Sequence, residues 1–361
     1  MCNRLYKFHN FADNFKSSAQ LPMKKPNITI HDIAKELNIS ASTVSRALNN
    51  NPRISPGTKH AVRELARKYN YQPNVMASSL RRGQGNTVGV IIPRINRSFF
   101  SNVIGGMEEI LSAAGYNLMI CQSHELYENE VKSIQAMINA RVNAVIMSVS
   151  METKKGNHIQ QLKERNIKLY FFDRVCDQIT SSAVTIDDEA GGYLATSHLI
   201  DQGYKRIVHI AGADHINIYK ARKLGYVRAM NKAGITIKDR WIMEYPLVIE
   251  GGQAAFKSFM KWKEKPDAVF CAGDYAALGI ILAAKKARIA IPHDLGVVGF
   301  ANEPFTEFLE PGLTSVDQKG EKMGRLVAEQ FLKETSNSDT HTPYEAQVLQ
   351  PELLIRTSSL R

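Results

Sequence analysis

The residues best suited to bind another molecule are a group of small hydroxyl side chains and one arginine near the N-terminus. Ser42, Thr43 and Ser45 lie beside Arg46 in the stretch ISASTVSRALNNN, residues 39–51. A solvated helix face normally carries long charged residues, whereas serine, threonine and alanine let another surface come very close. Hydroxyl groups donate hydrogen bonds to phosphate oxygens, and an arginine can bond the edge of a guanine through two parallel hydrogen bonds. This composition indicates contact with nucleic acid.

The distribution of charge indicates a nucleic-acid or membrane partner for the same part of the chain. The protein has 361 residues, a length that predicts two or three domains, and a formal net charge of +11. Residues 1–85 contain 14 Lys and Arg against 4 Asp and Glu, whereas residues 86–361 contain 32 against 31. A solvated basic tail is the alternative explanation, but this segment also has apolar periodicity. We therefore expect a folded, nucleic-acid-binding domain in the basic quarter of the chain.

Three short helices are expected to position the hydroxyl and arginine side chains over residues 27–72. Thr29 can cap the first helix, IHDIAKEL, and Asn38 ends it. The apolar stripe of this helix consists of Ile30, Ile33, Ala34 and Leu37. The third helix begins after Pro56 and Gly57. Its expected inward residues are Ala61, Val62, Leu65 and Ala66.

The second of these helices, capped by Ser40, carries the candidate contact residues. Its expected core residues are Val44, Ala47 and Leu48. Its expected outward residues are Ala41, Ser42, Ser45 and Arg46. A serine-rich cap on an ordinary helix would explain Ser40 alone, but not the basic surroundings. Three short helices with a tight turn between the first two predict a helix-turn-helix domain.

Residues 73–86 are expected to form a hinge. In NYQPNVMASSLRRGQGN, Pro73 suits the first turn of a short helix, and Gly83 and Gly85 indicate a flexible link. So short a helix is not expected to be stable by itself. The preceding residues 1–26 are expected to be a disordered extension, and Met23 would be a more natural start.

From Thr87 onward, apolar runs alternate with amphipathic helical stretches such as EEILSAAG and AALGIILAAKKA. The first series of runs is TVGVII (87–92), YNLMIC (116–121), NAVIMSV (143–149) and IKLYFF (167–172). The second series is RIVHIAG (206–212), DAVFCAG (267–273) and LGVVGF (295–300). Such runs indicate buried parallel strands of an α/β fold, here in two similar subdomains over residues 87–361. Ligands of such sheets bind at the carboxyl ends of strands, so binding residues should directly follow each run.

Catalytic and metal-binding roles find little support in the sequence. The cysteines (Cys2, Cys121, Cys176 and Cys271) are scattered, which indicates neither a zinc site nor a disulfide framework and fits a reducing cytoplasm. Asp187, Asp188 and Glu189 could form a metal or catalytic cluster, but capping of the following helix together with interaction with its dipole explains them more simply. We expect no cofactor and no catalytic residue.

Two other classes of protein were considered. A nucleotide-dependent α/β enzyme would carry a glycine-rich phosphate loop after its first strand, where this chain has VGVIIPRINRSFF. A periplasmic binding protein would need a secretion signal, and the N-terminus lacks its continuous apolar stretch. A periplasmic binding protein would also not need a basic N-terminal domain of three helices. No apolar run is long enough to cross a bilayer, so no membrane partner is expected.

The sequence resembles the lactose-repressor family of bacterial transcription regulators over roughly residues 27–357. The matching segments are TIHDIAKELNISASTVSRALNN, ISPGTKHAVRELARKYNYQPNVMASSLR, TVGVIIP, RKLGY, CAGDYAALG, VVGF followed by PGLTSV, and LLIRTS. The resemblance implies two doubly wound subdomains of the periplasmic-binding-protein type and a homodimer, in some members a tetramer. It also implies a sequence-specific regulator, expected to be a repressor of pseudo-palindromic operators. A small-molecule effector, expected to be a sugar or sugar derivative, would control it allosterically.

The resemblance also assigns DNA contacts to particular positions. Positions that read bases correspond to Ala41, Ser42 and Arg46. Positions that hold or flank the DNA backbone correspond to Thr29, Ile30, Ser40, Thr43, Ser45, Asn49 and Arg53. The hinge helix in the minor groove corresponds to Asn74, Ala77 and Leu80, with Leu80 as the intercalating wedge.

The effector site implied by the resemblance consists of Asn96, Phe99, Asp173, Arg222, Asp274 and Asn302. Asp173 and Arg222 match positions that bind hydroxyl or acidic groups, although a structural ion pair between them is the alternative. Two departures weaken the case for the usual sugar pose. Gly273 replaces a frequent asparagine and Ala301 a frequent aspartate, so Asn302 or Glu303 is expected to compensate.

Overall fold

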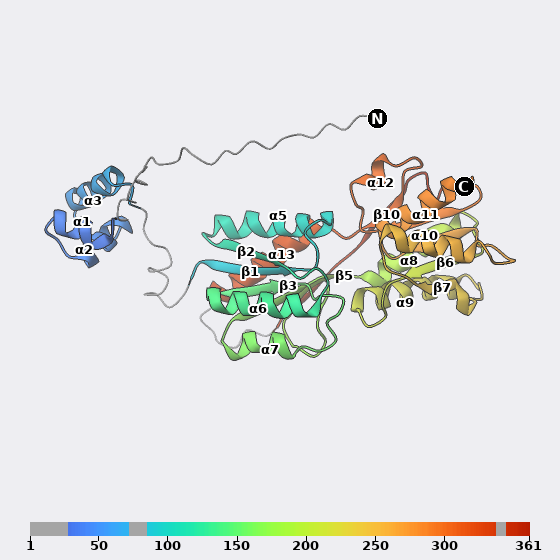
Figure 1. Cartoon of the computed structure of the whole chain (residues 1–361), viewed down its shortest axis with the longest axis horizontal. Helices are drawn as coiled ribbons and strands as arrows, with labels where there is room; N and C mark the ends of the chain where they lie inside the picture. The colour runs from blue at the N-terminus through green and yellow to red at the C-terminus, as the bar shows by residue number, and fades with distance from the viewer. Residues whose placement is uncertain (1–27, 72–84, 337–343) are drawn as a thin grey trace, which may run out of the picture. The chain divides into compact units, whose positions relative to one another are not determined.

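The computed structural model forms two compact units, Met1–Arg81 and Arg82–Arg361 (Figure 1). It describes residues 28–71, 85–336 and 344–361. The predicted N-terminal extension and the hinge positions Asn74, Ala77 and Leu80 lie outside these described residues. None of the helices in the described ranges is long and apolar enough to cross a membrane.

The N-terminal unit is a bundle of three short helices. The helices are α1 (Ile30–Glu36), α2 (Ala41–Leu48) and α3 (Pro56–Lys68). Their apolar core consists of Ile33, Ala34, Val44, Ala47 and Val62. The predicted inward position of Ala61 is wrong: Ala61 is exposed, and the helical turn places the next residue, Val62, in the core. The remaining predicted core positions of α3, Leu65 and Ala66, are half-buried against it.

Local side-chain hydrogen bonds start the first two helices at the predicted residues. Ser40 Oγ accepts from the Thr43 amide at 3.1 Å at the beginning of α2. At the beginning of α1, the Asp32 carboxylate accepts from the amide and hydroxyl of Thr29 at 2.8 and 2.7 Å. These bonds hold the pKa of Asp32 below its usual value. Each cap involves residues only three apart, which is why the sequence could reveal it.

The second unit contains two six-stranded sheets, each flanked by helices. The strands of the first sheet are β1 (Thr87–Ile92), β2 (Asn117–Gln122), β3 (Ala144–Met147), β4 (Lys168–Phe172), β5 (Ser182–Ile186) and β11 (Ala346–Leu349). Their order is β11-β5-β4-β3-β1-β2, and all neighbours are parallel. Its helices are α5 (Ser98–Ala113), α6 (Tyr127–Ala140), α7 (Asn157–Glu164) and α13 (Gly320–Ser336). One apolar cluster joins the sheet to α5 and α13, and another joins it to α6 and α7 (Figure 1).

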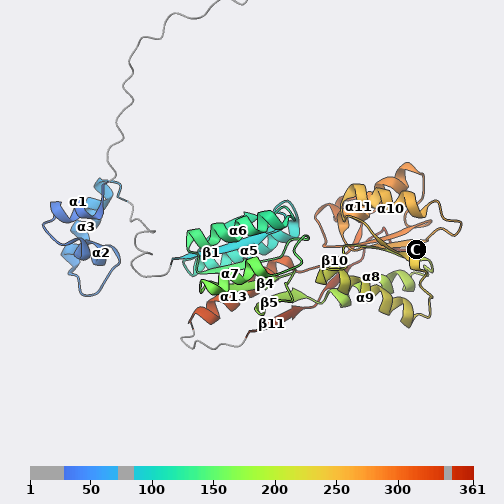
Figure 2. The same ribbon diagram turned by 60° about the horizontal axis from the view of Figure 1, so that its bottom comes forward.

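The second sheet has the order β12-β10-β9-β8-β6-β7, with only β12 antiparallel to its neighbour. Its strands are β6 (Ile207–Ala211), β7 (Ile242–Glu244), β8 (Ala268–Cys271), β9 (Gly296–Phe300), β10 (Thr314–Asp317) and β12 (Glu352–Leu354). Its helices are α8 (Asp188–Asp201), α9 (Asn217–Lys232), α10 (Ile249–Phe259), α11 (Asp274–Lys286) and α12 (Phe305–Phe308), with a 3₁₀ turn at Asp239–Trp241. Helices α8 and α9 lie on one side of this sheet and α10 and α11 on the other (Figures 1 and 2).

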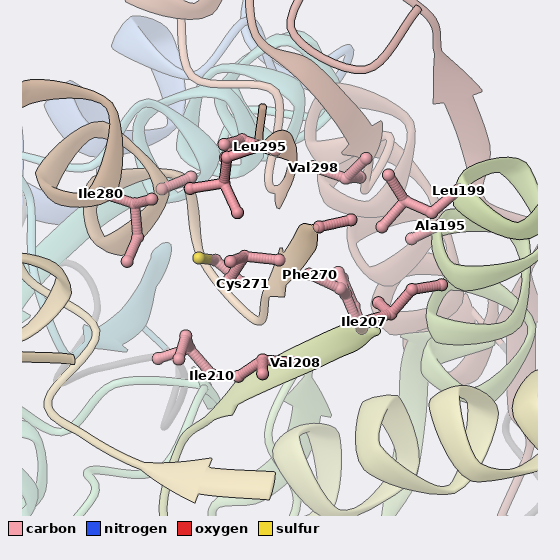
Figure 3. Close-up of a cluster of buried hydrophobic side chains, with 14 of the residues drawn as sticks. Ala195, Leu199, Ile207, Val208, Ile210, Phe270, Cys271, Ile280, Leu295 and Val298 are labelled. Atoms are coloured by element: carbon pink, nitrogen blue, oxygen red, sulfur yellow. The ribbon is translucent and has the colours of Figure 1, made fainter. Parts of the chain in front are cut away.

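The core of the second sheet is continuous and apolar. Figure 3 shows Cys271 among Val208, Ile210 and Ile280, and all four side chains are fully buried. Burial raises the pKa of the Cys271 thiol above its ordinary value, so this cysteine acts as a small apolar side chain, as the sequence predicted. Cys121 on β2 is only half-buried, because β2 is an edge strand of the first sheet.

The α/β class and the seven predicted strands are confirmed, each within about two residues of its predicted bounds. Five strands were not predicted: β5, β7, β10, β11 and β12. The chain also passes between the subdomains three times, after β5, after β10 and between β11 and β12. The first subdomain therefore combines residues 87–186 with α13 and β11 from near the end of the chain.

Candidate DNA-binding and effector-binding sites

Helix α2 presents a face of small polar groups and one arginine. Ser42, Arg46 and Asn49 are exposed, while Ser45 is half-buried. The face has no acidic side chain, and the last turn contains Arg46. An exposed guanidinium on a helix that begins with serine and alanine can approach a base edge, since no bulky neighbour blocks it.

The remaining predicted base-reading position, Ala41, faces partly inward. Its side chain is half-buried and packs against the three-helix core. It can still contact an apolar group at the surface, but only through its exposed edge. The outward position predicted from helical periodicity was therefore only partly correct, because Ala41 is the first helical residue after the Ser40 cap.

The predicted backbone-contacting residues surround α2. Ser40 and Thr43 share a hydroxyl–hydroxyl contact of 2.9 Å as well as the cap. Asn49 donates to the Ser45 carbonyl at 2.9 Å, which leaves its amide oxygen on an exposed side chain. Arg53 is exposed beyond α2.

The two residues at the start of the first helix that were predicted to contact the DNA backbone already make contacts within the protein. Both donors of Thr29 bond Asp32, and Ile30 is half-buried against the core. Thr29 therefore shapes the start of α1, and a DNA phosphate there would face the Asp32 carboxylate.

The second unit contains a cavity of about 370 Å³ between its two subdomains. The segments that line it follow β1, β2, β3, β4, β6, β7, β8, β9 and β10 in turn. The location at the carboxyl ends of both sheets agrees with the position predicted from the strand pattern. Of the six predicted effector residues, the cavity is lined by Phe99, Asp173, Arg222 and Asp274.

The other two predicted effector residues do not line the cavity. Asn96 is exposed in the turn before α5. The Asn302 amide oxygen accepts from Arg356 at 2.9 Å, which directs it away from the cavity, whereas the adjacent Glu303 is a buried lining residue. Of the two suggested compensating side chains, the structure therefore places Glu303 at the cavity.

Arg222 is the most tightly held polar residue of the cavity. Its Nε donates to Asp188 at 2.8 Å, its Nη1 donates to the Ala272 carbonyl at 2.8 Å, and its guanidinium lies 3.6 Å from the centre of the Phe300 ring. Its Nη2 is buried without a protein partner. Because a buried donor without a partner is costly, this nitrogen is a natural position for a ligand acceptor.

Close contact between α8 and α9 brings Asp188 to Arg222. A Cβ added at Gly192 would lie 2.2 Å from the Arg222 carbonyl, so only glycine permits this approach. Burial raises the pKa of Asp188 to about 7, against the opposing effect of Arg222. The ion pair of Arg222 is therefore with Asp188, and the suggested structural pair with Asp173 is wrong.

The predicted explanation of the acidic cluster, helix capping together with interaction with the helix dipole, agrees with the position of all three residues. Asp187 caps α8 by accepting from the Ala190 amide at 2.8 Å, and Asp188 and Glu189 lie in the first turn of α8. Glu189 also contacts Arg228 at 2.6 Å on the surface. The inward ion pair of Asp188 with Arg222 was not predicted. No metal-binding group of three or more His, Cys, Asp or Glu occurs in the described ranges.

Asp173 adds an acceptor to the same cavity. Its backbone is left-handed, with φ of 60°, and its Oδ2 accepts from Ser148 at 3.2 Å. Its Oδ1 is buried without a protein partner. Burial raises the pKa of Asp173, and the neighbouring Arg174 opposes that rise. The strained backbone is consistent with a side chain held in place for binding.

Asp274 lines the cavity but has its carboxylate already satisfied. Oδ1 accepts from Ser315 at 2.7 Å, and Oδ2 accepts from the Glu303 amide at 2.8 Å. Burial raises the pKa of Asp274 to about 6. We infer that Asp274 positions the loop after β9, in which Ala301 has the unusual φ of 119°.

Several cavity residues were not predicted, and they connect the two subdomains. Arg174 donates to Glu125 at 2.7 Å within the first subdomain and to the Tyr219 hydroxyl of the second at 3.3 Å. The sequence offered one signal for Arg174, its position directly after Asp173 at a strand end. Glu125 offered none, because it follows β2 in a turn of positive φ.

The loop before α5 is also held to the second subdomain. The Ser98 amide donates to Glu303 at 3.2 Å, and the Arg97 guanidinium lies 3.5 Å from the centre of the Tyr275 ring. Polar contacts between residues that line the cavity thus join the two subdomains. A molecule bound there would touch both subdomains and change the relative stability of their arrangements.

Comparison with known proteins finds a different family match in each of the two units. Residues 29–74 match the family "Bacterial regulatory proteins, lacI family", and residues 196–359 match "Periplasmic binding protein-like domain". Catabolite control protein A of Priestia megaterium is 32% identical over 317 residues, which cover 86% of this chain and 95% of that protein. This chain belongs to the lacI family. It is a DNA-binding transcriptional regulator with a periplasmic-binding-protein-like effector domain.

Other relatives agree with this assignment. The HTH-type transcriptional repressor PurR of Glaesserella parasuis is 30% identical, covering 91% of this chain and 98% of that protein. A solved transcriptional regulator CelR–cellobiose complex is 25% identical with a TM-score of 0.70, covering 92% of this chain and 99% of that one. The lac repressor dimer bound to operator and the anti-inducer ONPF has a TM-score of 0.81 at 20% identity, a similarity of fold. It covers 92% of this chain and 99% of that one.

Proposed function

We propose that this regulator is a cytoplasmic repressor that binds a pseudo-palindromic operator as a homodimer and responds to a sugar or sugar derivative. Its curated relatives include proteins named as transcriptional repressors, and one similar solved structure is a complex with cellobiose. No chemistry is needed for this function. Binding energy alone transmits the signal.

The observation that carries the proposal is a set of three buried polar atoms, on residues that line one cavity, that have no hydrogen-bond partner in the protein. Asp173 Oδ1 is an acceptor, and Arg174 Nε and Arg222 Nη2 are donors. Sugar hydroxyls can donate to Asp173 and accept from either arginine, because a hydroxyl has both capacities. Each such bond to a charged group contributes roughly 1.5–3 kcal/mol.

The proposed mechanism is a shift between two arrangements of the subdomains. A bound effector adds contacts to both sheets across the Arg174–Tyr219 and Glu303–Ser98 links. The arrangement of the subdomains then sets whether the two hinge helices of a dimer can pack together on DNA. The DNA-contacting side chains proposed for this step are those of α2 together with Asn74, Ala77 and Leu80.

The test begins with selection of an operator from random duplexes by the full-length protein, followed by titration with sugars. Arg222→Lys keeps the charge beside Asp188 but replaces the guanidinium by one ammonium group, so it removes Nη2 and also the Nη1 donor to the Ala272 carbonyl. We expect it to bind the selected operator like the wild type, while the effector concentration for half-response rises ten- to a hundredfold, corresponding to 1.5–3 kcal/mol.

Arg228→Lys is the matched control, since Arg228 lies on the same helix with a side chain that is 51% exposed. It should change neither DNA binding nor the effector response. Loss of operator binding in Arg222→Lys, with normal binding in Arg228→Lys, would mean that Arg222 is structural. Failure of the wild type to select any duplex would contradict the proposed function itself.

A further inference from the structure

The turn between β3 and α7 connects the first subdomain with the start of helix α9 in the second. The side chain of Met151 in this turn packs against an apolar cluster that includes Ile216 and Ile218 of the second subdomain. The carbonyl oxygen of Met151 accepts from His215 Nε2 at 2.5 Å. The side chain and the backbone of one residue therefore both contact the other subdomain.

A fully buried carboxylate of the first subdomain holds the same turn. Glu130 on α6 is 0% exposed, and its Oε2 accepts from the amide and the hydroxyl of Ser150 at 2.6 and 2.5 Å. Its Oε1 accepts from Thr153 Oγ1 at 2.9 Å and from His158 Nε2 at 2.7 Å. Ser150 precedes Met151 directly and Thr153 follows two residues later, so Glu130 fixes the turn on both sides of Met151.

The four hydrogen bonds favour the ionised form of Glu130. Burial raises the pKa of this carboxyl, but the bonds from His158, Ser150 and Thr153 outweigh burial and hold it below its ordinary value. A glutamine of the same shape has only one acceptor oxygen, and its NH₂ group would face either the Ser150 amide or the His158 ring. The substitution Glu130→Gln therefore weakens the hold on the turn while changing little in volume.

The turn is also connected to the cavity. The Met151 amide donates to Glu125 Oε2 at 3.0 Å, and Glu152 Oε2 accepts from the Tyr127 amide at 3.0 Å. Glu125, Met151 and Glu152 all line the cavity. A displacement of the turn would therefore move cavity residues and the contact with α9 together.

A second carboxylate of the first subdomain provides a comparison. Glu334 near the end of α13 is half-buried and accepts from the hydroxyls of Tyr170 and Ser182 at 2.7 and 2.8 Å. Within the part of the chain that the structure describes, its side-chain hydrogen bonds stay inside the first subdomain, and it does not line the cavity. Glu334 thus resembles Glu130 in chemistry but has no connection to the second subdomain.

We propose that Glu130 is a positioning residue of the allosteric response: it holds the turn after β3 in the form that docks Met151 on the second subdomain. Weakening its hydrogen bonds lets the turn move, and the observed arrangement of the subdomains then loses stability relative to the alternative one. This inference rests on the proposed function, in which the arrangement of the subdomains controls DNA binding.

The first measurement is hydrogen–deuterium exchange of the full-length protein without ligand or DNA, read by mass spectrometry. It compares the wild type with Glu130→Gln, with Met151→Ala and with the control Glu334→Gln. The informative peptide covers residues 215–222 of the second subdomain, where the amides of Tyr219 and Lys220 bond the Ile216 carbonyl at 3.1 Å. We expect this peptide to exchange at least fivefold faster in the first two variants and at the wild-type rate in the control.

An internal reference distinguishes lost docking from lower global stability. The central strand β8, residues 268–271, belongs to the same subdomain but lies in the core of its sheet. Global unfolding would accelerate exchange in both peptides, whereas undocking should accelerate it only in residues 215–222. The β8 peptide should therefore exchange equally in all four proteins.

The second measurement is the affinity for the operator selected as described above, at fixed salt concentration. Glu130→Gln and Met151→Ala should each change the operator Kd at least threefold, and in the same direction. The double variant should differ from the wild type no more than the larger single change, because both substitutions affect one contact. Glu334→Gln should leave the operator Kd unchanged.

Three results would overturn the inference. The first is faster exchange of Glu130→Gln in the first subdomain only, since Glu130 would then be merely structural. The second is an unchanged operator Kd, and the third is an additive effect in the double variant, which would show that Glu130 does not act through Met151.

Two further provisions keep the test decisive. If Glu130→Gln does not fold, Thr153→Val takes its place, because it removes one donor to Glu130 and keeps the shape of the side chain; a twofold effect in the same readouts is then expected. A wild type that selects no duplex would contradict the proposed function. The exchange measurement needs no DNA and would still test the docking role of Glu130.

Discussion

The face of α2 and the cavity of the second unit are both binding surfaces, but they hold their polar groups in opposite ways. Arg46 is exposed on a helix with no acidic neighbour in its first turn. Arg222, by contrast, is 3% exposed and bonded to a buried carboxylate, a carbonyl and an aromatic ring. Replacing Arg46 should weaken DNA binding only. Replacing a partner of Arg222 should also lower the free energy of unfolding.

The largest effect is expected where the cavity loses its internal compensation. Asp188→Ala leaves the Arg222 guanidinium buried without its ion-pair partner, which destabilises proteins by about 3–5 kcal/mol. Urea unfolding at pH 8, where Asp188 is charged, measures this loss. Asp187→Ala is the control: it removes only a helix cap, which costs about 1 kcal/mol. Equal losses of stability in the two variants would contradict the prediction that the ion pair with Arg222 contributes more than a helix cap.

The next largest effect is expected for a substitution in the hinge, and it should change DNA binding without changing the stability of the protein. Leu80→Ala should weaken specific binding, because a wedge between base pairs allows additional contacts at a cost of a few kcal/mol of unstacking. Non-specific binding, which depends on phosphate neutralisation, should stay almost unchanged. Fluorescence anisotropy on the selected operator and on unrelated DNA measures both. If the central pyrimidine–purine step is altered and both proteins lose equally, the wedge hypothesis fails.

Arg46→Ala sharpens the contrast with Arg222. An arginine that bonds a guanine edge contributes about 1–3 kcal/mol of discrimination at one base pair, so the variant should relax preference there without changing Tm. Arg53→Ala is the control, since a phosphate contact should weaken binding to all sequences alike and reduce its salt dependence. Base-by-base substitution of the operator distinguishes the two. If Arg46→Ala weakened binding to all DNA sequences equally, Arg46 would contact the DNA backbone rather than a base.

The last expected effect is a change of stability with pH. The folded-state pKa of Asp188, about 7, lies above its ordinary value of 3.8, so this group favours folding at low pH. Its contribution falls as pH rises from about 4 to 7. The wild type should therefore lose stability relative to Asp188→Asn over that range, in urea titrations at successive pH values. A constant difference would show that Asp188 does not titrate there, even with Asp173 and Arg222 nearby.

The sequence predicted the α2 face well because the interactions that build it are local. The Ser40 cap spans three residues, and Val44 and Ala47 lie one turn apart. Positions along one helix follow from its period, and the predicted inward and outward positions fail mainly at Ala61, which is exposed, and at Ala41 and Ser45, which are half-buried. The corresponding DNA contacts stay predictions until an operator is bound.

The sequence showed where the cavity lies, but not which of its side chains contact each other. Buried parallel strands showed where their carboxyl ends lie, and the resemblance to the lactose-repressor family implied Phe99, Asp173, Arg222 and Asp274, all of which line the cavity. Which carboxylate meets Arg222 depends on the packing of α8 on α9. That packing requires the absence of a side chain at Gly192, a condition that no periodicity reveals.

The unpredicted strands lack the continuous apolar run that indicates a strand covered on both faces. Strands β7, β11 and β12 lie at sheet edges, and β5 alternates buried with half-buried positions. Strand β10 is buried, but its residues TSVD are mostly polar. The backbone conformations that turned Asn302 from the cavity and Glu303 toward it were equally hidden, since positive φ is a property of the folded loop.

The late return of α13 and β11 to the first sheet also bears on synthesis of the protein at the ribosome. The first sheet begins at residue 87, yet its α13 face is complete only after residue 336 and its last strand after residue 349. By then all of the second sheet except β12 has been made. The nascent first subdomain therefore waits with the apolar surface of α5 and β4 uncovered while nearly 150 further residues are translated. A premature stop codon anywhere before α13 would leave that surface permanently open, so such truncated chains should be aggregation-prone and dependent on chaperones.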